Sequence, residues 1–157
     1  MRARATLAAI CVAAVAAQTQ ADTEVPDPSD ALVQCIARGA GAACIGEGAR
    51  ACMDQMGLGS DGICLGAENA WWLERIATAT TAMRNREPEA MARAARRGMP
   101  VATLDQVTQA FDTYRDAACG WRVAHWEGMH TGPVEMACVL RLTAQHALWL
   151  EASGQDQ

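Results

Sequence analysis

The feature that most constrains the fold is the placement of cysteines on either side of glycine-rich breaks. Six of the seven cysteines form three neighbouring pairs, and each pair is symmetric about such a break. Residues equidistant from the turn of an antiparallel helix pair lie side by side. We therefore predict the disulfides Cys35–Cys44, Cys52–Cys64 and Cys119–Cys138, although spacing alone leaves other pairings open.

The seventh cysteine lies in an N-terminal segment that is typical of a secretory signal. Two arginines among the first six residues precede an unbroken apolar run, Leu7–Ala17, which is too short to span a bilayer. Cleavage could follow Ala17 or Ala21, and we favour the second. We therefore predict a signal peptide at residues 1–21, a flexible lead-in at 22–28, and a periplasmic or secreted protein. Its six remaining cysteines suit an oxidising compartment.

Composition favours helices over strands. Alanine fills 34 of 157 positions and β-branched residues are sparse, which argues against an all-β fold. At 51% hydrophobic, the chain is too apolar for a disordered tail. Its net charge of −5 gives no basic footprint for nucleic acid. No segment after the signal is apolar enough to predict a transmembrane helix.

Apolar periodicity between the breaks predicts an all-α, disulfide-stapled bundle of about five helices without a sheet. It forms a single domain at residues 29–152, followed by a polar tail at 153–157. The main helices are expected at residues 29–38, 42–55, 62–86, 104–127 and 133–152, with a short basic helix at 89–97. Thr103 and Gln106 form a capping box that opens the fourth of these main helices.

Most of the tryptophans are expected to lie in the core. The predicted apolar stripe of residues 104–127 includes Tyr114 and Trp121, and that of residues 133–152 includes Trp149. Trp71 and Trp72 are adjacent on a helix and should be buried to different extents. Trp126, beside the last glycine turn, is the best candidate for an exposed aromatic at a binding surface.

Motifs that could indicate catalysis or a cofactor have simpler interpretations. Gly57, Gly59 and Gly62 match the spacing of a dinucleotide fingerprint but lack the strand and βαβ unit that it needs. No C-x-x-C motif is present, and the three histidines lack an accompanying nucleophile motif. We therefore predict no enzyme, no cofactor and no metal site. An enzyme that uses a buried acid such as Glu68 is the weakest alternative, since no paired carboxylate motif supports it.

Two charged runs are interpreted structurally. Arg93, Arg96 and Arg97 form a basic patch that is expected to be a solvated helix end, because acidic residues lie close by. Arg115 and Asp116 are sequence neighbours and should not face one another on a helix. We therefore expect each of these two residues to form an ion pair across the bundle.

Three passages resemble the LprI-type lysozyme inhibitor domain of exported bacterial proteins. They are Phe111–Cys119, Cys138–Thr143 and Cys64–Trp72, and the likeness covers roughly residues 35–151. Leu73, Ala77 and Thr80 depart from the family pattern, which usually has Asp, Asn and Tyr there. The matching signature residues are Tyr114, Arg115, Asp116, Cys119, Cys138, Leu142 and Thr143.

The resemblance implies an exported protein that binds and inhibits a lysozyme. The exposed, disulfide-braced glycine turns are the expected contact regions, represented by Asp61, Trp126 and His130. The alternative is an accessory or structural module of the cell envelope that binds another protein. The sequence leaves the oligomeric state open.

Overall fold

The computed structural model describes residues 24–155, and this part of the chain is entirely helical. The predicted signal peptide lies outside the described residues. The elements are α1 (Ser29–Ala37), a 3₁₀ turn η1 (Gly41–Cys44), α2 (Glu47–Met56), α3 (Asp61–Arg84), α4 (Glu87–Arg96), α5 (Leu104–Ala124) and α6 (Thr131–Gln155). The described chain thus has six α-helices, and the short basic helix, α4, accounts for the sixth.

Three boundaries differ from the sequence prediction by three residues or more. The helix expected at residues 42–55 is divided by Gly46, whose φ of 93° places it in the left-handed region between η1 and α2. Glycine adopts this conformation without steric cost. The helix α5 ends at Ala124 rather than near residue 127, and α6 continues to Gln155, into the predicted polar tail.

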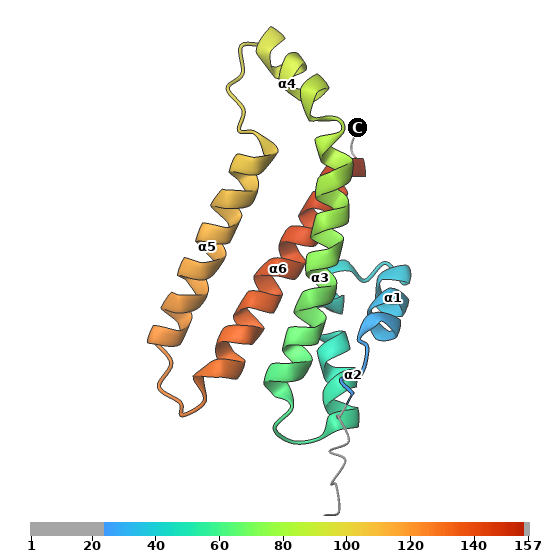
Figure 1. Cartoon of the computed structure of the whole chain (residues 1–157), viewed down its shortest axis with the longest axis vertical. Coiled ribbons are helices and arrows are strands. Elements are labelled where there is room, and N and C mark those ends of the chain that lie inside the picture. Colours follow the sequence, from blue (N-terminus) through green and yellow to red (C-terminus); the bar gives the residue numbers. More distant parts are fainter. Residues whose placement is uncertain (1–23, 156–157) are drawn as a thin grey trace, which may run out of the picture.

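Three long helices lie side by side, with α6 between α3 and α5 (Figure 1). The helices α3 and α6 run in the same direction, because α4 and the antiparallel α5 carry the chain back between them (Figure 1). The helices α1 and α2 pack on the α3 side. Gly48 makes this packing close, since a Cβ there would collide with Pro28 and Leu32 of the α1 segment.

The core lies between α3, α6 and the α1 segment. Trp72 and Leu32 are fully buried there, against the small side chains of Ala144 and Ala147 and the larger Leu140 on α6. A second cluster surrounds the Cys52–Cys64 bridge. Alanines on α6 leave room for the Trp72 indole, so an alanine-rich sequence still forms a packed core.

Glu68 joins α3 to the start of α2. Its Oε1 accepts hydrogen bonds from the Gly46 N–H (2.7 Å) and the Trp72 indole N–H (3.0 Å), and its Oε2 accepts from the Ala49 N–H (2.7 Å). The first N–H groups of a helix have no partner within the helix. The fully buried Glu68 carboxylate supplies that partner from another helix, so all its described contacts are structural.

The three predicted disulfides are confirmed. Cys35–Cys44, Cys52–Cys64 and Cys119–Cys138 each bridge α-carbons 5.6 Å apart, which is usual for a disulfide. The first links α1 to η1, the second α2 to α3, and the third α5 to α6. The capping box of Thr103 and Gln106 is also present. Proteins with several structural disulfides belong to oxidising, extracytoplasmic compartments.

The predicted burial is wrong for three aromatic residues. Trp72 is buried and Trp71 half-buried, as expected, but Trp121, Trp149 and Tyr114 are 69%, 50% and 60% exposed. For Tyr114 and Trp121, which lie on α5, the reason is the position of that helix at the edge of the array (Figure 1). It packs mainly on α6, so only part of its apolar stripe has a neighbour to cover it.

Candidate functional site

The two larger glycine turns lie at the same end of the molecule, at the bottom of Figure 1. One joins α2 to α3 and the other joins α5 to α6. We call this region, residues 54–63 and 121–135, the turn end. Two segments far apart in sequence therefore share one surface.

The first turn is tight and fixed at its base. Gly57 and Gly59 have φ angles of 84° and 86°, which strongly favour glycine. The Ser60 hydroxyl donates a hydrogen bond to the Gly57 carbonyl (2.6 Å), and the Cys52–Cys64 disulfide joins the flanking helices. The turn thereby holds the Leu58 side chain fully in solvent.

The second turn positions an aromatic residue. The Trp126 ring lies so close to Gly128 that a Cβ on that glycine would collide with it. Before the turn, the His125 ring lies 4.1 Å from the Trp121 ring, and His125 Nδ1 is 2.9 Å from the Trp121 carbonyl oxygen. The Cys119–Cys138 disulfide joins the two helices, α5 and α6, that flank the turn.

Large hydrophobic side chains are exposed across the turn end. Their exposed fractions range from 46% for Trp126 to full exposure for Leu58. The set comprises Leu58, Ile63, Trp121, Trp126 and Met129. Isolated exposed hydrophobics are common, but a group of them at one end is typical of an interaction surface.

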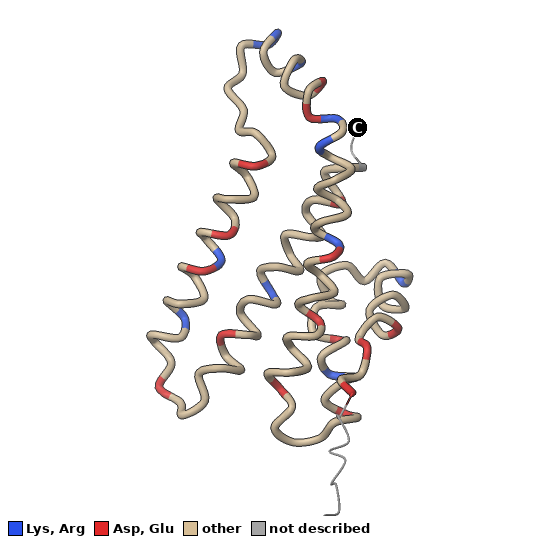
Figure 2. Tube along the Cα trace, in the orientation of Figure 1, with Lys and Arg blue, Asp and Glu red and all other residues tan. Residues whose placement is uncertain are grey.

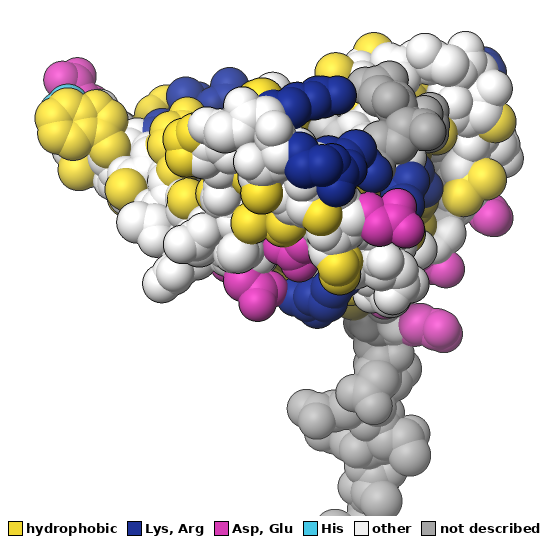
Figure 3. Space-filling model, turned by 90° about the horizontal axis from the view of Figure 1, so that it is seen from above, with side chains coloured by type: hydrophobic (Ala, Val, Ile, Leu, Met, Phe, Trp, Pro, Cys, Tyr) yellow, Lys and Arg dark blue, Asp and Glu magenta, His cyan; other side chains and the backbone are white. Residues whose placement is uncertain are grey.

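The turn end is acidic and the opposite end is basic (Figure 2). Four exposed carboxylates and one arginine give the turn end a net charge of −3; they are Asp54, Asp61, Glu127, Glu135 and Arg122. Residues 84–105, which we call the α4 end, carry five arginines and three acids, a net charge of +2. In the view from above, arginine side chains gather next to hydrophobic ones (Figure 3).

All three residues predicted to contact a partner are exposed in the turn end. Asp61 begins α3, Trp126 follows α5, and His130 directly precedes α6. Sequence reasoning missed Leu58 and Met129 as exposed apolar residues, although each lies between glycine-rich turn positions, which was an available signal. It also missed Trp121, because helical periodicity placed this residue on a core-facing stripe.

The Tyr114-Arg115-Asp116 segment has a structural arrangement. Arg115 bonds Asp112 (3.0 Å) and Asp116 (3.0 Å) on its own helix. The expected ion pairs across the bundle are therefore wrong. Asp112 lies three residues before Arg115, which is a normal spacing for an ion pair along a helix, and the long guanidinium side chain also reaches the adjacent Asp116. Tyr114 is exposed, and Asp116 remains mostly in solvent.

A stack of rings connects this segment to α6. The Arg115 guanidinium lies 5.5 Å from the Phe111 ring, which stacks on His146 at 3.9 Å. His146 in turn lies 5.6 Å from the Trp149 ring. Burial lowers the pKa of His146, the Asp112 charge opposes this shift, and Arg115 adds to it. The neighbouring signature residues on α6 are also internal, with Leu142 half-buried and Thr143 fully buried.

Comparison with known families decides the assignment. The family model of the lysozyme inhibitor LprI matches residues 52–150, well over half of the chain. The chain belongs to the LprI family. Searches of curated proteins and of solved structures returned no match. The LprI match is narrower than the predicted likeness to residues 35–151: it contains both turns and two disulfides, but not α1 or Cys35–Cys44.

The described residues were also compared with the requirements of a metal site and of a membrane-spanning helix. Among residues 24–155, no group of three or more His, Cys, Asp or Glu side chains is placed to hold a metal ion. No helix among these residues combines the length and hydropathy needed to cross a membrane.

Proposed function

We propose that the mature protein, released from its signal peptide into the periplasm or beyond, binds a lysozyme through the turn end and inhibits it. Membership of the LprI family supports this function. The observation that carries the proposal about the surface is the coincidence of exposed hydrophobic side chains and a net charge of −3 at one end. A basic enzyme would find both charge complementarity and apolar anchors there.

The two properties have different roles in binding. Acidic side chains accelerate encounter with a basic partner and make the association rate depend on salt. Buried aromatic side chains usually dominate the binding energy, and tryptophan is among the most common anchors. Trp126 is therefore expected to contribute most to affinity, whereas Asp61 should affect mainly the association rate.

The disulfides suit this role. Cys52–Cys64 and Cys119–Cys138 close the helix pairs that present the two turns. A surface ordered before binding loses less conformational freedom when the complex forms. Reduction should therefore weaken inhibition even under conditions in which the chain remains helical.

The test is inhibition of a hen-type lysozyme by the oxidised mature protein at low and moderate salt. We expect Trp126→Ala to weaken inhibition at least about tenfold, as for a central aromatic anchor. Tyr114→Ala is the matched control, because Tyr114 is an exposed aromatic outside the turn end, and it should inhibit like the wild type.

Two outcomes would contradict the proposal in different ways. Full inhibition by a variant lacking Trp126, Asp61 and His130 would exclude the turn end while leaving the inhibitor function in place. No inhibition by micromolar wild-type protein would exclude this lysozyme as the partner. Capture of a different envelope protein by the wild type but not by Trp126→Ala would then identify the accessory module considered above.

A further inference from the structure

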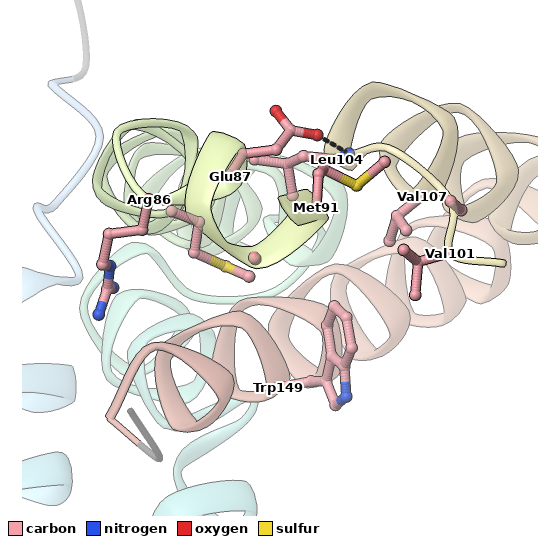
Figure 4. Close-up of a pocket in the computed structure, with 10 residues that line it drawn as sticks. Arg86, Glu87, Met91, Val101, Leu104, Val107 and Trp149 are labelled. Atoms are coloured by element: carbon pink, nitrogen blue, oxygen red, sulfur yellow. Dashed lines mark hydrogen bonds between the residues drawn. The ribbon is translucent and has the colours of Figure 1, made fainter. Parts of the chain in front are cut away.

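The α4 end contains a pocket that the proposed contact with lysozyme does not use. It has a volume of about 200 Å³ and lies between the end of α3, α4, the linker to α5, and α6. Figure 4 shows Val101 and Val107 on one side, Met91 and Leu104 above, and the Trp149 indole rising from α6 toward the cavity. Eight of its ten lining residues are apolar.

Two large hydrophobic side chains in the pocket wall are about half exposed to solvent. Trp149 is 50% exposed and Val101 is 46% exposed. Both line the cavity, on α6 and on the linker before α5. Concave apolar surfaces with a few polar groups are the usual form of small-molecule sites. A volume of about 200 Å³ is enough for a short aliphatic chain.

The polar groups at the pocket are largely occupied. Glu87 turns toward α5 and accepts a hydrogen bond from the Leu104 N–H (2.7 Å), shown as the dashed line in Figure 4. Arg86 donates to the Gly154 carbonyl (2.9 Å), and its guanidinium points away from the cavity. The interior therefore offers hydrocarbon contact rather than hydrogen bonds.

The pocket lining contains one arginine and one glutamate, but the α4 end as a whole has a net charge of +2. Arg93 on α4 and Arg97, which caps the end of that helix, follow the wall residue Ala90 at spacings of three and seven, so they lie on the same side as Ala90. Arg93 has a long contact with Glu89 (3.7 Å), and both partners are substantially exposed. A suitable ligand would therefore have an apolar chain that fills the cavity and an anionic group that interacts with these arginines.

We propose that the α4 pocket binds a single aliphatic chain that ends in a carboxylate, as in a fatty acid. The chain lies against Trp149, Val101 and Met91, and the carboxylate lies near Arg93 and Arg97. This site is at the opposite end of the molecule from the turn end, so it does not depend on the proposed inhibition of lysozyme.

The test is calorimetric titration with straight-chain carboxylates from butanoate to decanoate, each below its micelle concentration. Affinity should rise about fourfold per methylene, which corresponds to ~0.8 kcal/mol per buried CH₂, and then reach a plateau when the pocket is full. Alcohols of equal length should bind more weakly, and alkylammonium ions more weakly still. A rise without a plateau, or equal binding of the ammonium series, would overturn the proposal.

Variants locate the site. Ala90→Leu adds volume to the wall without harming helix propensity and should weaken octanoate binding about tenfold or more. Arg93→Glu with Arg97→Glu should reduce carboxylate binding to the level of the alcohol. Arg38→Glu reverses an exposed arginine at the end of α1, away from the pocket, and should leave binding unchanged.

A fluorescence measurement separates pocket binding from loss of fold. Octanoate with bromine at its terminal carbon should quench the wild-type tryptophan fluorescence, and Trp149→Phe should remove most of that quenching. Unchanged quenching in Trp149→Phe, or unchanged affinity in a folded Ala90→Leu variant, would place the chain elsewhere and refute the site.

Discussion

The helices α3 and α5 both pack beside α6, yet they are held in different ways. On α3, Cys64, Glu68 and Trp72 are fully buried, and the helix contacts α2 as well as α6. On α5, only Leu104 and Cys119 are buried along 21 residues. One helix is fixed mainly by packing, and the other by a few separate attachments.

The attachments of α5 are spread along its length. Glu87 accepts a hydrogen bond from the first N–H of the helix, the Phe111–His146 stack holds the middle, and Cys119–Cys138 fixes the lower part. Such point attachments fix the position of a helix without covering its surface. The comparison indicates that packing on α3 supplies stability, while α5 keeps Trp121 available to solvent at the turn end.

Glu68→Ala should have the largest effect, on the α3 side. It would leave the Gly46 and Ala49 N–H groups and the Trp72 indole N–H without their acceptor in a buried region. Hydrogen bonds to a charged group contribute about 1.5–3 kcal/mol each, but such contributions are not additive. We expect the free energy of unfolding to fall by about 4 kcal/mol, measured by urea denaturation.

Glu74→Ala is the matched control for this prediction. Glu74 lies on the same helix but is exposed, so its removal should change the free energy of unfolding by less than about 0.5 kcal/mol. If the two variants were equally stable, the buried carboxylate would not be what joins α2 to α3.

Removal of the Cys119–Cys138 bridge should have the next largest effect, on the α5 side. This disulfide closes a segment with a sequence separation of 19, for which chain entropy predicts a loss of about 3 kcal/mol. In the variant with both cysteines changed to serine, amide hydrogen exchange should increase along α5 before it increases along α3.

Removal of Cys52–Cys64 provides the reciprocal comparison. Exchange should then increase in α2 and at the start of α3, with α5 less affected. Equal loss of protection in α3 and α5 in both variants would show that the described bundle opens as one cooperative unit. The proposed difference between α3, held by packing, and α5, held by separate attachments, would then be wrong.

The smallest effect concerns pH and the middle attachment of α5. Because burial lowers the pKa of His146, the unfolded chain binds this proton more readily than the folded chain. The stabilisation from neutral His146 is therefore complete above its unfolded pKa, near 6.5, and is lost as pH falls through the window down to the lowered folded pKa. Thermal unfolding in that range should show this slope, and His146→Phe should reduce it. An identical slope in the two proteins would assign the pH dependence to other groups.

The three disulfides could be predicted from the sequence, because cysteines placed symmetrically about a glycine-rich turn indicate which helices pack side by side. Sequence reasoning located Asp61, Trp126 and His130 on exposed turns for the same reason. It failed where the outcome depended on distant neighbours. The stripe that includes Trp121 assumes a covering helix, and the link from Glu68 to Gly46 spans 22 residues with no local pattern.

The shared direction of α3 and α6 has an electrostatic consequence. Their aligned peptide dipoles place partial positive charge at the turn end and partial negative charge at the α4 end. Asp61 lies in the first turn of α3 and Arg84 in its last turn, so side-chain charges oppose the dipole at both ends. Each such interaction contributes typically 0.3–1 kcal/mol. The acidity that would attract a basic partner is thus also part of what stabilises the fold, and reversing Asp61 should weaken both together.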